Sequence, residues 1–298
     1  MALAIAVLTI TLFVGCIGEH LTVSDSELKK FAEVLFSREH LDFQHSVKID
    51  LQNRVPKKHY TDVSPEPFLS VSPTILETPM VTRIRELFDN YDIDSSHAEH
   101  VTPEEQKEEE NFIDALLATD QIDRVMRFLS DHRFIEAGNQ TYKETLKAVW
   151  FFQYARKQSS GLRTSSGFEH VFLGELKGRG GGLIGMHNWI FINAAEKAGK
   201  LNYFGYKSKK ILGCASHKVI IAHVVYHYAG KVKLTSMFIG ISPELEVSLY
   251  TLCYFVRPNK HCRLSMGGKK FGIQTYAMNH TGSPSLGTAY PVAAFIDA

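Results

Sequence analysis

Apolar residues in the first half of the chain recur with the period of a helix. The first stripe of such residues consists of Leu28, Phe31, Ala32 and Leu35. Ser24 and Ser26 are candidate caps for this helix, and Glu27 falls in its first turn. The proline-containing stretch from Pro56 to Pro79 interrupts the helical pattern and is predicted to be a loop.

Two further helical regions follow this loop. The stretch "TPEEQKEEENFIDALLATDQIDRVMRFLSDH" has Thr102 as a candidate cap and Pro103 at the first helical position. Its early acidic residues interact favourably with the helix dipole, and the acidic run is predicted to be a solvated helix face. The stretch "ETLKAVWFFQYAR" is predicted to be another amphipathic or buried helix.

After Ser160 the apolar period shortens and turn residues become frequent. β-Branched and aromatic runs separated by glycine and lysine predict strands at "EHVFLGELKG", "NWIFIN", "KVIIAHVVYHY" and "FGIQTYAMN". One helix is expected among them, at "SPELEVSLYTLCYF", where Ser242 can cap and Pro243 takes the first position. We therefore expect an α+β fold, with a helical N-terminal part of about residues 24–160 packed on a β-rich part of about residues 161–298.

The N-terminal segment "MALAIAVLTITLFVGCIGEH" is apolar and ends in small residues. Its length and ending predict a secretory signal peptide, residues 1–18, that is cleaved near Gly18. A membrane anchor is the alternative, because neither Lys nor Arg provides the usual positive start. No other stretch is apolar for long enough to span a bilayer. The expected product is a secreted protein without stable membrane insertion.

The remainder of the chain has the composition of a globular protein that its core must hold together. The full sequence, with the N-terminal segment included, is 44% hydrophobic and 22% charged. Removal of the signal leaves Cys214, Cys253 and Cys262, an odd number that predicts no complete disulfide framework. Cys253 is expected to be a small buried residue, and a Cys214–Cys262 bridge is an option that the spacing does not support. In the secretory pathway the sequons at Asn139 and Asn279 would mark glycosylated surface positions.

The stretch from Lys197 to Lys233 contains eight lysines and neither Asp nor Glu. Tyrosines and phenylalanines alternate with these lysines. This combination favours a local surface for single-stranded nucleic acid, although scattered solubilising lysines are an equally good explanation. The whole chain has a formal charge of +1, so it is not a general polyanion binder.

Three ionisable groups, Glu169, His170 and Glu175, occur together in "SGFEHVFLGE". Strand alternation would place Glu169 and Glu175 on one face, with Val171 and Leu173, and would place His170 on the other with Phe172 and Gly174. Downstream, the glycine-dense loop Gly178–Gly182 precedes His187. Two histidines and a lysine suit RNA cleavage by the 2′-hydroxyl, which needs a base, an acid and a cation near phosphorus. A metal-hydrolase alternative lacks HExxH or similar spacing.

Several motifs also resemble one family. These are "LFDNYDIDSSHAEHVTPEEQKEEENFIDALLAT", "SSGFEHVFLGE", "GMHNW", "FIGISPELEVSLYTLC" and "GTAYP". Together they are similar to the EndoU family of uridylate-preferring endoribonucleases, over about residues 24–291. The resemblance implies a helical N-terminal part, a C-terminal part of two β-rich halves, and cleavage that leaves 2′,3′-cyclic phosphate ends. It also implies dependence on Mn²⁺ or Ca²⁺, with single-stranded RNA rich in uridine as the partner of a monomer.

The resemblance assigns roles to individual residues. His170 in "FEH" corresponds to the first catalytic histidine of the family, and we assign it as the general acid; His187 in "GMHNW" corresponds to the second, and we assign it as the general base. Glu169 and Glu175 match carboxylates that support activity through a metal or through histidine positioning. Met186 stands where the family usually has leucine, and extra glycines lengthen the preceding loop.

The catalytic lysine and the nucleotide contacts follow from the C-terminal motifs. Both Lys231 and Lys233 lie near the expected position, with a small difference in spacing, and Lys233 is favoured. Ser236, Thr288 and Tyr290 are the residues expected to face the nucleotide. A secreted protein of the same fold that binds RNA or a protein without cleavage is the alternative function.

Overall fold

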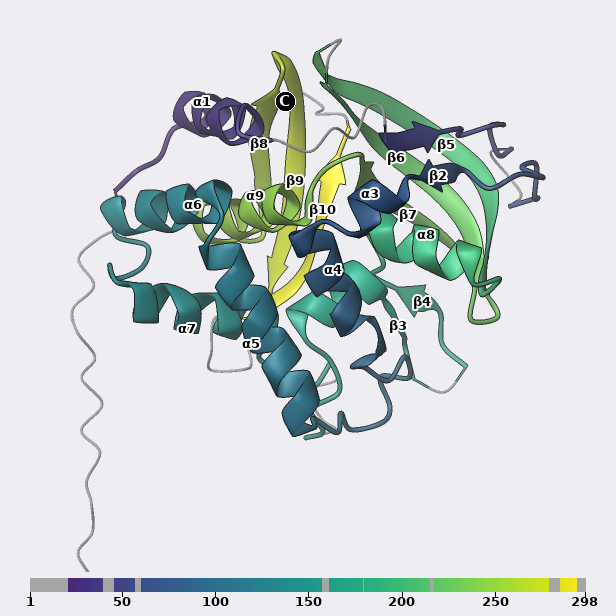
Figure 1. The fold of residues 1–298 in the computed structure, drawn as a ribbon, viewed down its shortest axis with the longest axis horizontal. Helices are drawn as coiled ribbons and strands as arrows, with labels where there is room; N and C mark the ends of the chain where they lie inside the picture. The colour runs from purple at the N-terminus through teal and green to yellow at the C-terminus, as the bar shows by residue number, and fades with distance from the viewer. Residues whose placement is uncertain are drawn as a thin grey trace, which may run out of the picture.

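The structure is a computed structural model, and it describes residues 21–39, 46–56, 60–156, 161–178, 180–214, 217–278 and 285–293. Helices and antiparallel sheets occur together, which confirms the α+β class (Figure 1). The predicted signal peptide and the Asn279 sequon lie outside the described residues. Within those residues, no helix is both long and apolar enough to cross a membrane.

The first half of the chain is mostly helical. Its helices are α1 (Asp25–Phe36), α3 (Pro73–Leu76), α4 (Pro79–Glu86), α5 (Pro103–Leu117), α6 (Asp120–Asp131) and α7 (Asn139–Trp150), with a 3₁₀ turn η1 (Leu87–Asp89) after α4. Ser24 caps α1 by accepting from the Glu27 amide, and Thr102 and Glu105 form a capping box on α5. Thr119 caps α6, so the long acidic stretch forms two helices instead of one.

The proline-containing stretch from Pro56 to Pro79 is not a simple loop, which corrects that prediction. Strand β2 (Leu69–Val71) lies within it and pairs antiparallel with β1 (Val47–Ile49). Helix α3 follows directly, with Ser72 as its cap and Pro73 at its start. Pairing with a strand 20 residues earlier is a tertiary contact that local proline content does not reveal.

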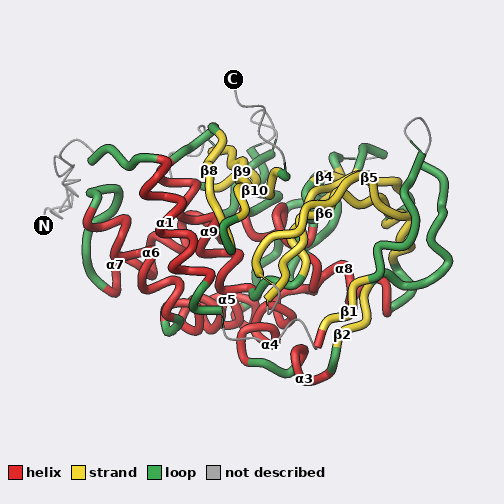
Figure 2. Tube along the Cα trace, turned by 90° about the horizontal axis from the view of Figure 1, so that it is seen from above, coloured by secondary structure: helices red, strands yellow, loops and turns green. Residues whose placement is uncertain are grey.

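The second half contains two three-stranded antiparallel sheets. One is β5 (Leu201–Cys214), β6 (His217–Tyr228) and β7 (Lys231–Ile239), and the other has the order β10 (Leu286–Val292), β9 (Lys269–Ala277), β8 (His261–Met266). A short hairpin joins β3 (Glu175–Leu176) to β4 (Leu183–Ile184). Figure 2 shows β8–β10 beside α1 and α9, whereas β5 lies beside α8 and near the β1–β2 region, where Phe68 stacks on Tyr203.

Two stretches that were predicted to be strands are helical. "NWIFIN" begins α8 (Trp189–Lys197), because the Asn188 side chain caps the amides of Ile190 and Phe191. "EHVFL" forms a π-helical turn, Glu169–Leu173. Ser166 accepts from the Glu169 amide, and the Glu169 carboxylate accepts from the Ser166 amide. This reciprocal cap explains the helix, so the predicted separation of Glu169 and His170 onto two strand faces was wrong.

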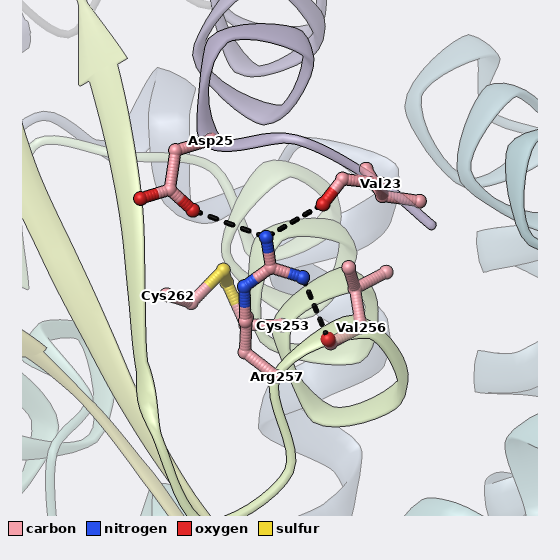
Figure 3. The surroundings of a disulfide bond; sticks show 6 residues. All are labelled: Val23, Asp25, Cys253, Val256, Arg257 and Cys262. Carbon is pink, nitrogen blue, oxygen red and sulfur yellow. Dashed lines mark hydrogen bonds and ion pairs between the residues drawn. A yellow bond between two sulfur atoms is a disulfide. The ribbon is translucent and has the colours of Figure 1, made fainter. Parts of the chain in front are cut away.

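Helix α9 (Pro243–Val256) is buried on almost every side and is covalently joined to β8. Ser242 caps it, as predicted. A disulfide connects Cys253 of α9 to Cys262 of β8 (Figure 3). Cys253 is therefore buried but not a free thiol, and the Cys214–Cys262 option was wrong. The chain turns back from α9 into β8, which brings two cysteines nine residues apart into contact.

Candidate active site

His170 lies on the π-helical turn and is almost completely buried, with 7% of its surface exposed. Its Nδ1 is 2.7 Å from Oε1 of Glu175, the first residue of β3. Gly174 ends the turn with a positive φ of 76°, which lets the chain reverse into that strand. The carboxylate and the imidazole are thus brought together by a sharp reversal of the chain.

His187 is held beside His170 by backbone hydrogen bonds. The Met186 amide donates to the His170 carbonyl at 2.9 Å, and the His187 amide donates to the Val171 carbonyl at 2.7 Å. A Cβ on Gly185 would lie 1.9 Å from the His170 carbonyl oxygen, so only glycine permits this approach. Met186 has a positive φ of 65°, which is uncommon for a residue with a side chain. The two imidazole centroids are 6.4 Å apart.

The contacts of His187 determine which of its nitrogens carries the proton. Nδ1 lies 2.9 Å from the Ser236 carbonyl oxygen and 2.8 Å from Oγ1 of Thr235. A carbonyl oxygen can only accept, so Nδ1 is the protonated nitrogen of the neutral ring. The Thr235 hydroxyl in turn donates to the Met186 carbonyl at 3.2 Å. Nε2 of His187 is consequently left with a lone pair, as a general base requires.

Burial controls the charge of both histidines. It lowers the pKa of His170 to about 4, with the Arg156 charge as a further cause, although the hydrogen bond to Glu175 opposes the change. Burial lowers the pKa of His187 to about 3, assisted by the charges of His170 and Lys233. Both rings are therefore neutral at pH 7 without substrate. Only His170 has a carboxylate in contact, so it is better able to become an imidazolium.

The Glu175 carboxylate is the centre of a buried polar cluster. Its Oε1 accepts from Nε of Arg156 at 2.6 Å and from Oγ of Ser165 at 3.1 Å, in addition to His170. Burial alone would raise the Glu175 pKa, but the His170 hydrogen bond and the Arg156 charge hold it below its usual range. Burial and the neighbouring Glu175 charge raise the pKa of Glu169 well above its usual value. The surroundings thus favour the ionised form of Glu175 and the protonated form of Glu169.

Lys233 and Lys231 occupy different surroundings on β7. The Lys233 charge acts on both histidines, and burial lowers its own pKa. Lys231 donates from Nζ to the Gly180 carbonyl at 3.0 Å, in the loop between β3 and β4. Lys233 is therefore the lysine that the fold brings to the histidine pair.

The three residues expected to contact the nucleotide also lie near His187. The Tyr290 ring stacks on the His187 ring with centroids 5.3 Å apart. Ser236 provides the carbonyl oxygen that His187 contacts, while its hydroxyl donates to the Pro291 carbonyl at 2.5 Å. Oγ1 of Thr288 is buried and makes no hydrogen bond within the described residues. Of these three residues, Tyr290 is thus the one whose side chain contacts the His187 ring.

The side chains of this site do not form an evident metal site. Within the described part of the chain, no group of three or more His, Cys, Asp or Glu residues is arranged to hold a metal ion. Oε1 of Glu169 and Oε2 of Glu175 are buried without hydrogen-bond partners. The Arg156 guanidinium, however, already neutralises Glu175, and the surroundings of Glu169 favour its protonated form. These donors therefore do not fit a resident divalent cation.

The remaining sequence predictions concern the surface. Asn139 is exposed at the first residue of α7, where a sequon is accessible. The basic stretch from Lys197 to Lys233 is not a single patch of solvated lysines. Lys207 donates to the Pro56 carbonyl and Lys210 to the Ala293 carbonyl, so part of this charge serves tertiary contacts.

Sequence reasoning missed three residues that contact the histidine pair or its carboxylate, namely Arg156, Ser165 and Thr235. Arg156 comes from the segment after α7, and Thr235 comes from β7, so no local motif joins them. The helical turn of His170 did have a local signal. Ser166 followed by Glu169 three residues later has the spacing of a capping box.

Comparison with known proteins finds relatives that match most of this chain. A uridylate-specific endoribonuclease of Paralichthys olivaceus is 32% identical over 282 residues, which cover 90% of this chain and 71% of that protein. The corresponding values for a uridylate-specific endoribonuclease of Mus musculus are 33%, 91% and 66%. A uridylate-specific endoribonuclease B of Danio rerio is 37% identical over 207 residues, covering 69% of this chain and 72% of that protein.

A solved structure and a family model agree with these relatives. The structure of XendoU, described as a splicing-independent snoRNA-processing endoribonuclease, matches with a TM-score of 0.72 at 28% identity. The match covers 90% of this chain and 97% of that one. The family model of endoribonuclease XendoU matches residues 27–291, so this chain belongs to the XendoU family of endoribonucleases.

Proposed function

We propose that this endoribonuclease cleaves single-stranded RNA after uridylates by attack of the 2′-hydroxyl, leaving a 2′,3′-cyclic phosphate. The pairing of His170 with His187 is the observation that carries the proposal. One ring contacts a carboxylate and the other contacts only neutral oxygens, so the two are suited to opposite proton transfers. The relatives named above are called uridylate-specific, which supports uridylate as the preferred position.

In the first step the 2′-oxygen attacks phosphorus while Nε2 of His187 accepts the 2′-hydroxyl proton. The Nδ1–H of His187 stays bonded to the Ser236 carbonyl, which keeps the ring oriented as charge develops on it. Lys233 stabilises the negative charge that grows on the phosphoryl oxygens. Its lowered pKa reflects burial, and in such surroundings a positive charge acts more strongly than it would in water.

The bond from phosphorus to the 5′-oxygen then breaks, and Nε2–H of His170 protonates the leaving oxygen. His170 is neutral in the free protein, so it must gain a proton when RNA binds. A phosphodiester brings negative charge to the site, which raises the pKa of the imidazole. Glu175 stabilises the imidazolium, and Arg156 and Ser165 orient Glu175. No water is consumed, and the products are a cyclic phosphate and a 5′-hydroxyl.

Manganese dependence is a further expectation, and the donor set limits how it can arise. Glu175 is paired with Arg156, and the surroundings of Glu169 favour its protonated form, so these carboxylates are not expected to form a dedicated metal cage. A divalent ion would supply charge neutralisation for the RNA phosphates. The proton transfers assigned to the two histidines do not depend on it.

Secretion is also part of the proposal. The predicted signal peptide, residues 1–18, would direct the chain to an oxidising compartment. A disulfide between Cys253 and Cys262 supports this location, because such bonds persist where the surroundings are oxidising. N-terminal sequencing of protein recovered from the medium of expressing cells tests it, and an intracellular product that keeps residue 1 would contradict it.

The test of function uses the chain from Glu19 and an oligoribonucleotide with one uridine, with and without Mn²⁺. Mass spectrometry should identify a 2′,3′-cyclic phosphate after the uridine and a 5′-hydroxyl on the other product. A matched substrate with 2′-deoxyuridine should remain intact. His187→Asn should lose turnover while RNA affinity persists, since it removes the base but not the phosphate-binding charges. Absence of cleavage under both metal conditions would instead support a protein that only binds RNA.

A further inference from the structure

The sheet β8–β9–β10 presents two faces with different chemistry. Cys262 pairs with Ile273 across β8 and β9, and the disulfide joins Cys262 to α9, so this face of the sheet is covered by α9. The opposite face carries Tyr276 and Gln274 of β9, since residues alternate along a strand. Tyr276 is 46% exposed, which is high for a tyrosine in a central strand.

The register connects this second face to the active site. Thr288 pairs directly with Tyr276, and Tyr290 pairs with Gln274, so all four side chains lie on one face. Tyr276 and Tyr290 are diagonal neighbours on this face, because Tyr290 lies two residues beyond the direct partner of Tyr276. Tyr290 in turn stacks on His187. Tyr290 therefore lies between the exposed ring of Tyr276 and His187, the proposed general base.

The charge of this sheet suits RNA. From His261 to Met278, and again from Ser285 to Ala293, the chain contains no Asp or Glu. Basic residues occur in the first of these segments, including Arg263, Lys269 and Lys270. An exposed aromatic ring on a sheet without acidic residues is the arrangement that single-stranded nucleic acids use for base stacking.

We infer that Tyr276 forms a second nucleobase subsite, which stacks the base of a nucleotide adjacent to the scissile uridylate in single-stranded RNA. This inference rests on the proposed function. It assigns to Tyr276 the positioning of the strand and leaves the proton transfers to the histidines. The neighbouring base can lie on the 5′ or the 3′ side of the uridylate, and the two arms of the test distinguish these.

The experiment measures kcat/KM on a trinucleotide with a central uridine. Tyr276→Ala should lower kcat/KM by about 5- to 150-fold, the range expected for loss of one stacked base. Tyr276→Phe keeps the ring and should stay near wild type, because stacking does not need the hydroxyl. The matched control is Tyr60→Ala, which removes a tyrosine that is 45% exposed and contacts Lys207, and it should change nothing.

Two abasic substrates identify the occupied side. Each replaces the base on one side of the uridine by an abasic ribose. With only one of the two substrates should the wild type lose the stacking of a base on Tyr276. With that substrate, Tyr276→Ala should lower kcat/KM little further. Equal losses for Tyr276→Ala on both abasic substrates would show that Tyr276 acts only through Tyr290 and would overturn the subsite. Unchanged kcat/KM for Tyr276→Ala on the full trinucleotide would overturn it as well.

Binding measurements separate this inference from the proposed function. Fluorescence anisotropy with a 2′-deoxyuridine trinucleotide, which cannot be cleaved by the 2′-hydroxyl route, reports stacking without chemistry. A weaker affinity of Tyr276→Ala than of Tyr276→Phe supports the subsite even if the wild type cleaves no RNA. Equal affinity of the two variants would contradict the subsite while leaving a nuclease activity intact.

Discussion

Replacement of Glu175 by glutamine tests how the buried cluster controls catalysis. In the structure, His170 is in contact with the Glu175 carboxylate, while the Arg156 charge acts on it with opposite effect. Glu175→Gln removes the favourable charge and leaves the unfavourable one. A counter-charge at this distance changes a pKa by about 1 to 3 units, so the imidazolium population at a given pH should fall about 10- to 1,000-fold. We expect kcat/KM to fall by the same factor, because the leaving oxygen depends on that proton.

The same substitution has a separate effect on stability. Arg156 would keep its bonds to Ser165 and to the Gly287 carbonyl, but it would lose the ion pair with a fully buried carboxylate. Loss of one partner from a buried pair costs roughly 3 kcal/mol. Urea unfolding measures this loss. Kinetics are then recorded well below the melting temperature, so that unfolding does not lower the apparent rate.

A second variant distinguishes charge from structure. Arg156→Met combined with Glu175→Gln removes both buried charges, which should recover part of the stability and part of the His170 pKa. Asp123→Asn is the control, because it breaks an exposed ion pair with Arg127 on α6 and should change neither quantity appreciably. If Glu175→Gln alone kept wild-type kcat/KM and pH dependence, the assignment of His170 as the acid supported by Glu175 would be refuted.

Three further predictions follow from the site and from the disulfide. Lys233→Met should lower kcat by about 100- to 1,000-fold, whereas Lys231→Met should leave kcat close to wild type. Single-turnover assays measure both effects, and the reverse order would assign the catalytic role to Lys231. In the free protein the His170 pKa is about 4, so this ring has released its proton at neutral pH, whereas the complex with RNA holds a proton on His170. Affinity for an uncleavable RNA should therefore increase as pH falls from 7.5 to 5, by at most about tenfold per pH unit. Anisotropy titrations at constant ionic strength check this slope, which should disappear in His170→Asn. Substitution of Cys253 and Cys262 by alanine should lower the free energy of unfolding by about 2–3 kcal/mol without loss of kcat, and inactivity of a folded variant would contradict a purely structural role.

The helices and their boundaries follow largely from local sequence. Ser24, Thr102 and Ser242 each cap the helix that their position predicted, because a cap depends on side chains within three residues of the helix start. The long strands at "KVIIAHVVYHY" and "FGIQTYAMN" also form as expected. The histidine motifs could be recognised from the chain alone for the same reason, since each is a short, contiguous pattern.

Tertiary contacts decided the conformation of short apolar runs. "EHVFL" and "NWIFIN" have the composition of strands, yet Ser166 and Asn188 cap them as helical turns. Periodicity cannot distinguish a buried strand from a buried helix over five or six residues. The capping side chains were visible in the sequence, but only the surrounding fold shows that, within the described residues, strand pairing of these two segments is limited to one bridge between Asn188 and Phe238.

The protonation states of the site belong to the fold alone. Arg156 follows α7, Glu175 begins β3 and Thr235 lies in β7, and no sequence spacing brings them to the two histidines. Burial lowers the pKa of both rings, and it does so only because distant segments exclude water from them. The sequence was enough to identify the two histidines as the reacting groups. Only the packing of distant segments places a carboxylate beside His170, which suits an acid, and a carbonyl beside His187, which suits a base.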